Sequence, residues 1–128
     1  MTQNIPVPYD AKFQSPIPSI WRDCIIQIVE AFKDKDFDRL NTLPSVQSIN
    51  LAYVAEIAKN IDDYGAHLMS LAEESWHTSV CLYLENESWN AIIDLFTVEE
   101  GRSDLIIDLF IVKKEDQFIF RINDIYVP

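Results

Sequence analysis

The C-terminal half of the chain, residues 76–127, carries β-branched and aromatic residues at alternate positions. This alternation is typical of strands that bury one face. Short polar segments interrupt it, and one of them places Gly101 where a hairpin favours a residue with positive φ. The pattern therefore predicts four antiparallel strands joined by tight turns, over residues 76–84, 88–98, 103–112 and 117–127.

Two helices are predicted before these strands. Ser19 is a suitable N-cap, and the residues after it repeat apolar side chains at the spacing of one helical face. Ser48 is a second suitable cap, and Gly65 stands where that helix would end. The first apolar stripe comprises Ile20, Trp21, Cys24, Ile25, Ile28, Val29 and Phe32, and the second comprises Ile49, Tyr53, Ile57, Ile61 and Tyr64.

The remaining segments complete a single domain over residues 1–128. Residues 1–18 contain four prolines and predict an irregular arm, residues 19–65 hold the two helices, and residues 66–71 have room for a short strand before the main sheet. We expect an α+β fold in which two N-terminal helices pack on one face of a four- or five-stranded, mainly antiparallel sheet.

The two faces of the predicted sheet differ in character. The third strand has one wholly apolar row, from Leu105 to Ile111, which we assign to the helix-covered face. The other row mixes apolar and acidic side chains. We expect this mixed face to contact another molecule, because it is more apolar than a solvated sheet face usually is. The alternative is that the sheet curls, or that the N-terminal arm and the loop around Phe37 cover it.

Composition narrows the class of partner. The chain has 128 residues, with 21 acidic and 10 basic side chains and a formal charge of −11. This balance disfavours nucleic acid as a ligand and favours a basic protein. Residues 1–13 do not resemble a signal peptide and no apolar run is long enough to span a membrane, so we expect a cytoplasmic protein without a membrane partner.

No pattern in the sequence indicates catalysis. Cys24 and Cys81 lie in apolar periodic segments, which favours reduced thiols. His77 and Cys81 would lie on one predicted strand about 13 Å apart, too far for a nucleophile and its base. His67 near apolar sequence is more typical of a packed residue. With no metal-ligand spacing and no glycine-rich phosphate loop, we expect no catalytic residue, cofactor or metal, and a protein that is not an enzyme.

Three segments resemble a family of small uncharacterised bacterial domains. They are residues 61–65 with 74–81 (IDDYG and ESWHTSVC), residues 99–105 (EEGRSDL) and the closing YVP of residues 126–128. The resemblance implies a small bacterial protein and carries no catalytic residues. A looser likeness, in size and acidity only, is to bacterial immunity proteins that neutralise a toxin domain.

The function we expect is an immunity protein that occludes the active site of a basic toxin domain, for example a nuclease. Acidic side chains would pair with the toxin's basic residues and aromatic side chains would anchor the contact, with Trp89 or Tyr126 as additional anchors. Two alternatives stay open. One is a ligand-binding or enzymatic cavity between helices and sheet, which a pocket containing His67, His77 or Asp124 would indicate. The other is a homodimer that forms through the mixed face. The candidate partner-binding residues are Asp94, Phe96, Glu99, Glu100, Asp104, Asp108 and Phe110.

Overall fold

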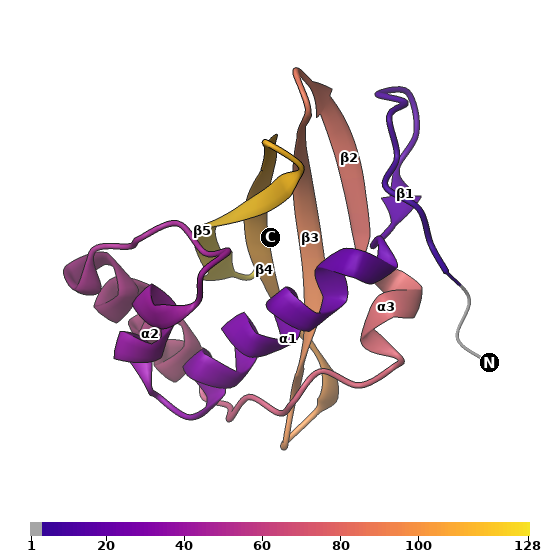
Figure 1. Cartoon of the computed structure of the whole chain (residues 1–128). Helices are drawn as coiled ribbons and strands as arrows, with labels where there is room; N and C mark the ends of the chain where they lie inside the picture. Colours follow the sequence, from indigo (N-terminus) through magenta and orange to yellow (C-terminus); the bar gives the residue numbers. More distant parts are fainter. Residues whose placement is uncertain (1–3) are drawn as a thin grey trace.

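The structure, a computed structural model, describes residues 4–128 and confirms the α+β fold (Figure 1). Its five strands form one antiparallel sheet in the order β1-β2-β3-β4-β5. Both long helices precede the main strands in the chain, as the sequence predicts. The elements are β1 (Ser15–Pro16), α1 (Ser19–Lys33), the 3-10 helix η1 (Phe37–Thr42), α2 (Leu51–Tyr64), α3 (Ser75–Thr78), β2 (Val80–Glu85), β3 (Ser88–Thr97), β4 (Gly101–Lys114) and β5 (Gln117–Tyr126).

The three predicted hairpins are present. Asn86 and Glu87 have φ of 53° and 54°, and Glu115 and Asp116 have φ of 49° and 66°, as two-residue turns between antiparallel strands require. Gly101, the first residue of β4, has φ of 73° directly after the β3–β4 turn. Acidic residues and asparagine therefore supply most of the left-handed turn positions that this glycine-poor chain needs.

The predicted apolar rows form the core beneath α1. In β3, Trp89 and its alternate neighbours through Leu95 have no exposed surface, and the same row of β4 is equally buried. Trp21 of α1 packs edge-on against Trp89 and Phe118, with ring centroids 5.5 and 5.6 Å apart. Side chains thus fill the space between α1 and the sheet. Each of these large residues contributes about 1.5–3 kcal/mol by leaving water.

The helix boundaries differ from prediction at their first residues. α1 begins at Ser19, but the preceding residue, Pro18, provides no side-chain cap, and the Ser19 hydroxyl instead accepts a hydrogen bond from the Ile5 N–H at 2.8 Å. α2 is capped by Asn50, whose side chain accepts from Ala52 N–H, so Ser48 is not its cap. At the other end Gly65, with φ of 86°, terminates α2 as predicted.

The apolar stripes also need correction. Ile20 is 63% exposed, although it belongs to the predicted stripe of α1. In α2 the buried residues are Val54, Ile57 and Ile61, while Tyr53 stays exposed. The buried face therefore keeps Ile57 and Ile61 from the prediction and adds Val54, since residues three and four positions apart share one face of a helix.

Two predicted strand segments are wrong. Residues 75–78 form the single helical turn α3, and β2 begins only at Val80. The turn buries Trp76, and the Ser79 hydroxyl fixes its end by donating to Ser75 O and accepting from Asp94 N–H. Alternating polar and apolar residues over so short a stretch fit either structure. The predicted strand at 66–71 is reduced to one bridge, between Leu68 and Thr97.

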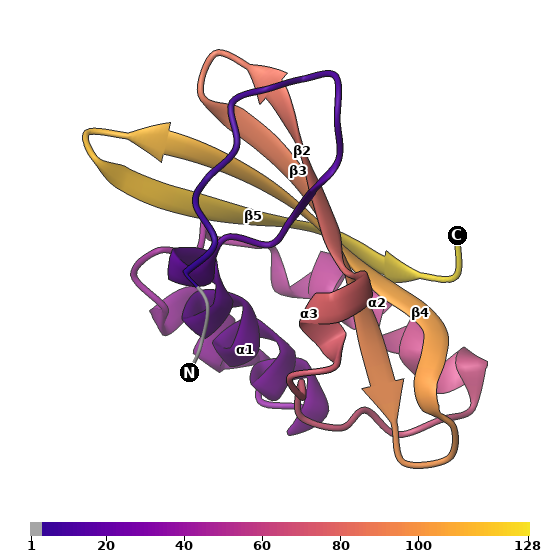
Figure 2. The same ribbon diagram turned by 90° about the vertical axis from the view of Figure 1, so that its right-hand side faces the viewer.

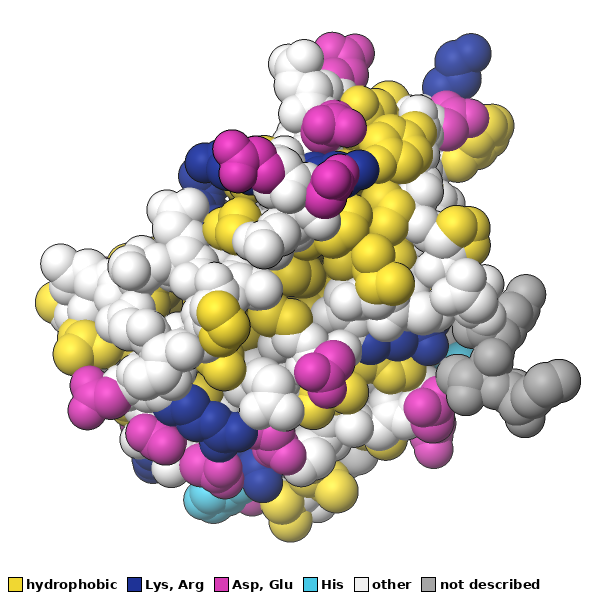
Figure 3. Space-filling view, in the orientation of Figure 1, with side chains coloured by type: hydrophobic (Ala, Val, Ile, Leu, Met, Phe, Trp, Pro, Cys, Tyr) yellow, Lys and Arg dark blue, Asp and Glu magenta, His cyan; other side chains and the backbone are white. Residues whose placement is uncertain are grey.

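The N-terminal arm is irregular except for β1, although the predicted segment also includes residues 1–3, which lie outside the described part of the chain. Its loop runs beside β2 and β3 (Figure 2). Pro8 O accepts a hydrogen bond from Trp89 Nε1 at 2.7 Å, and the Tyr9 ring lies 5.3 Å from that of Tyr83. The arm therefore packs on the same side of the sheet as α1, where apolar side chains are visible at the upper end of the molecule (Figure 3).

Candidate functional site

The sheet has a second side, opposite α1, which we call the open face. None of the helices in the described part of the chain crosses it, because α1 lies on the other side and α2 packs beside β5 (Figures 1 and 2). Most of its side chains are half-buried by one another. By strand register and burial, the open face comprises Leu82, Asn90, Ile92, Asp94, Phe96, Ile106, Asp108, Phe110, Val112, Ile119, Arg121, Asp124 and Tyr126.

The aspartates of the open face are held by uncharged donors. Asp108 accepts hydrogen bonds from the side-chain amides of Asn90 at 2.7 Å and Asn123 at 3.1 Å. Asp94 accepts from the Thr78 hydroxyl at 2.5 Å. Amides and hydroxyls orient these carboxylates without neutralising them. The face therefore retains negative charge that a basic group can approach.

Arg121 lies on the open face and does not pair with these carboxylates. Arg121 places its guanidinium 4.5 Å from the Phe110 ring centroid and donates from Nε to the Asn123 side chain at 3.2 Å. Within the described residues, Asp94, Asp108 and Asp124 make no ion pair within 4.0 Å. The apolar side chains and the unpaired carboxylates consequently share one surface.

The structure divides the seven predicted partner-binding residues into two groups. Asp94, Phe96, Asp108 and Phe110 lie together on the open face. The others, Glu99, Glu100 and Asp104, lie at the β3–β4 hairpin and bond to residues at and beyond the C-terminal end of α2. In β4, three residues, Ser103 to Leu105, oppose Leu95 alone, so Asp104 lies in a bulge outside the paired register that places Asp108 on the open face.

The hairpin carboxylates anchor the turn to the helical layer. Glu99 accepts from the His67 backbone N–H at 2.8 Å and lies 2.7 Å from His67 Nδ1. Tyr64 donates its hydroxyl to Glu100 at 2.5 Å, which raises the pKa of the tyrosine. The hydrogen bonds from His67 lower the pKa of the Glu99 carboxyl. These groups already have partners, so they are less available to another protein than the aspartates of the open face.

The Glu99 contact predicts a pH-dependent contribution to stability. Because the folded pKa lies below the usual 4.5, the contribution is complete above that value and disappears as the pH falls through the folded pKa. We expect Glu99→Gln to be less stable than wild type at neutral pH, with the difference shrinking in acid. Urea unfolding between about pH 3 and 7 measures it. Glu56→Gln, at an exposed carboxylate of α2, serves as control; a difference that grows in acid would contradict the assignment.

The sequence reasoning missed part of the open face and misplaced one anchor. Leu82 joins it from β2, because it pairs with Asn90 of β3. Arg121 and Asp124 join it from β5, where a register shift next to Asp108 changes the pairing. Trp89 is fully buried and cannot serve as an anchor.

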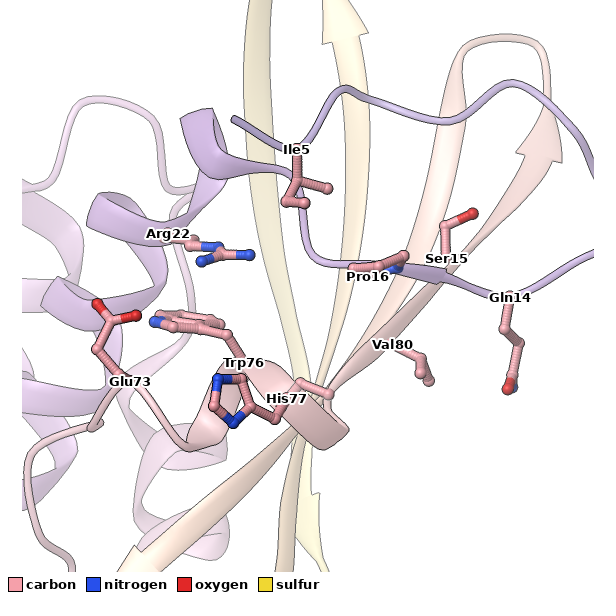
Figure 4. Close-up of a pocket in the computed structure, with 10 residues that line it drawn as sticks. Ile5, Gln14, Ser15, Pro16, Arg22, Glu73, Trp76, His77 and Val80 are labelled. Carbon is pink, nitrogen blue, oxygen red and sulfur yellow. The ribbon is translucent and has the colours of Figure 1, made fainter. Parts of the chain in front are cut away.

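A cavity lies at the β1 edge of the sheet, away from the space between helices and sheet where the alternative function would require it. Its volume is about 470 Å³. Arg22 of α1, Trp76 and His77 of α3, and Ile5 and Pro16 of the arm surround it (Figure 4). His77 lines this pocket, but the pocket is not between the helices and the sheet, where the ligand-binding alternative expects it. Because His77 belongs to a helical turn, the earlier placement of His77 and Cys81 on one strand is wrong.

The cysteines have little nucleophilic character. Burial and the nearby Asp23 carboxylate raise the pKa of Cys24 to about 11, and burial raises that of Cys81 to about 12. Both thiols are free and stay protonated near neutral pH.

In residues 4–128 no group of three or more potential metal ligands comes together. The same residues contain no helix long and apolar enough to cross a membrane.

Comparison with known proteins identifies the family. The sequence profile of DUF7668, a domain of unknown function, matches residues 29–128. The chain belongs to this family. DUF7668 covers all of the sheet from β2 to β5 and therefore the entire open face, while the N-terminal arm and Arg22 lie before the matched region. No curated protein and no solved structure matched the chain.

Proposed function

We propose that this DUF7668 protein binds a basic protein partner through the open face, and that it acts in the cytoplasm as an immunity protein occluding a toxin domain. One observation carries the proposal. The open face is a broad, partly apolar sheet surface, uncrossed by the described helices, whose aspartates lack ion pairs. Apolar side chains gathered on a sheet face that no helix covers are typical of a contact site.

Charge complementarity indicates the chemistry of the partner. Lysine or arginine side chains of a partner could bind Asp94, Asp108 and Asp124. Amide and hydroxyl contacts already hold these carboxylates in place, so binding would lose less side-chain conformational entropy. The formal charge of −11 would also accelerate the encounter with a basic protein. A nuclease that presents phosphate-binding residues has the required surface.

The apolar side chains would supply most of the affinity. Phe96 and Phe110 are half-buried, on neighbouring strands, and so are already restrained before any partner arrives. Aromatic residues near the centre of an interface commonly dominate the binding energy. Once a partner covers them, the surrounding aspartates become desolvated, which penalises any partner without matching positive charge.

The division of the acidic residues provides a matched test. Asp108→Lys and Asp104→Lys change the net charge equally, but Asp108 is paired in register among the residues of the open face, whereas Asp104 lies in the bulge near the β3–β4 hairpin. We expect the tagged wild-type protein to retain a basic partner from its source organism and to release it at high salt. Asp108→Lys should lower the association rate about tenfold or more and weaken its salt dependence, with a much smaller effect for Asp104→Lys.

Other outcomes would redirect the proposal. Equal effects of the two substitutions would remove the open face as the binding site and leave only a non-specific charge effect. A concentration-dependent dimer in sedimentation, lost in Asp108→Lys, would assign the open face to a second copy of the chain. An acidic or neutral partner would contradict the proposed toxin class.

A further inference from the structure

The cavity at the β1 edge is built from segments that are distant in the sequence. The arm supplies Ile5 and Pro16, α1 supplies Arg22, and α3 supplies Trp76 and His77 (Figure 4). Its volume of about 470 Å³ lies within the range of pockets that enclose small molecules, about 300–1,000 Å³. This site is separate from the open face and does not depend on the proposed function.

Arg22 is fixed in position before any ligand arrives. Its Nε and Nη2 both donate to Ile17 O, at 3.2 and 3.0 Å, and its guanidinium lies 5.1 Å from the Trp76 ring centroid. Two hydrogen bonds to one carbonyl use one edge of the planar group. The other edge, formed by Nη1 and Nη2, is available for the bidentate geometry that a carboxylate prefers.

Arg22 also lacks a charged partner. Within the described residues it makes no ion pair within 4.0 Å, although acidic residues outnumber basic ones by two to one in this chain. Lys33, on the same helix, lies near both Glu30 and Asp34. Arg22 is half-buried, is held by hydrogen bonds and has no ion pair with a carboxylate of the described residues. Its guanidinium can therefore bind an anion from solution.

The other walls define what kind of anion fits. Trp76 is only 6% exposed, and together with Ile5 and Pro16 it offers an apolar surface beside the guanidinium. Ser79 is already engaged with Ser75 O and Asp94 N–H, so it adds no free hydroxyl. Glu73 also lines the cavity, and its carboxylate disfavours ligands with several negative charges, such as nucleotides.

We infer that this cavity binds a small organic monocarboxylate, with its carboxylate on the free edge of Arg22 and its apolar body against Trp76. One negative charge balances one guanidinium, and the aromatic wall favours a flat or aliphatic body. His77 is exposed at the cavity and forms a polar part of its wall, on the side that faces solvent.

The test compares an acid with its neutral amide. The ¹⁵N-labelled full chain is titrated at millimolar concentrations with 3-phenylpropionate and, separately, with 3-phenylpropionamide. Saturable shifts of the Trp76 indole and Arg22 Nε signals are expected with the acid. The dissociation constant of the amide is expected to be higher than that of the acid by about tenfold or more. Trp76→Phe assigns the indole signal among the three tryptophans. Equal binding of acid and amide, or no saturable shift at Trp76, would overturn the inference.

Variants provide an independent readout. Arg22→Met removes the guanidinium and should weaken binding of the acid about tenfold or more, while leaving the weak binding of the amide unchanged. Lys59→Met removes one exposed positive charge from α2 and should leave both unchanged. Unaltered binding of the acid to Arg22→Met would refute the site. If that variant does not fold, the comparison of acid and amide on the wild-type chain decides the question.

Discussion

Replacing Trp21 with alanine is expected to lower the free energy of unfolding by about 3–5 kcal/mol. Trp21 is fully buried and its ring meets three others edge-on, those of Trp89, Phe118 and Phe120. Truncation removes these ring contacts between α1 and the sheet. It also leaves a cavity, because the paired strands can relax only partly to fill it. Urea-induced unfolding followed by far-ultraviolet circular dichroism measures the loss.

The adjacent residue provides the control. Ile20 is also a large apolar residue of α1 but is 63% exposed, so Ile20→Ala should change stability by about 0.5 kcal/mol or less. Two neighbouring truncations with such different effects would confirm the orientation of α1 on the sheet. Similar losses at both positions would mean that the helix is rotated about its axis, which would move Arg22 away from the cavity.

The largest expected effect on partner binding is that of Phe110→Ala. Phe110 lies on the open face with Arg121 over its ring, and both would be covered by the proposed partner. Truncation of such an aromatic anchor should weaken binding by about 2 kcal/mol, or about 30-fold, mainly through faster dissociation. Surface plasmon resonance with the purified partner would measure the two rates separately.

Phe13→Ala is the matched control for this prediction. Phe13 is 66% exposed on the N-terminal arm, which packs on the α1 side of the sheet, so its truncation should leave both rates unchanged. Thermal unfolding of each variant shows whether the fold is retained. A larger effect for Phe13 than for Phe110 would transfer the binding site to the arm and refute the open face.

The candidate site was only partly predictable from the sequence. Strict alternation in β3 correctly placed Asp94 and Phe96 on the face opposite the core. Alternation also placed Ile106, Asp108 and Phe110 correctly in β4, but it could not show the bulge that sets three residues, Ser103 to Leu105, opposite Leu95 alone. Counting alternate residues cannot detect such a shift, because it arises from the pairing with the neighbouring strand.

The contacts of the acidic residues in the β3–β4 hairpin could not be predicted from the sequence either. Glu99 and Glu100 look like free surface charges in the sequence, yet they hold His67 and Tyr64, more than thirty residues earlier in the chain. The cavity likewise depends on Arg22 meeting Trp76 across fifty-four residues. Side chains that meet only after the helices dock on the sheet leave no local pattern.

The sequence by itself determined the four long strands except for the start of β2, their hairpins, the core rows of β3 and β4 and the sign of the charge. These follow from local propensity and from periodicity, which act over a few neighbouring residues. Only the tertiary structure decided which carboxylates share the open face, which serve as anchors of a turn, and where Arg22 is held. Such choices depend on strand register and helix docking, which are set by the packing of the whole chain and not by any single segment.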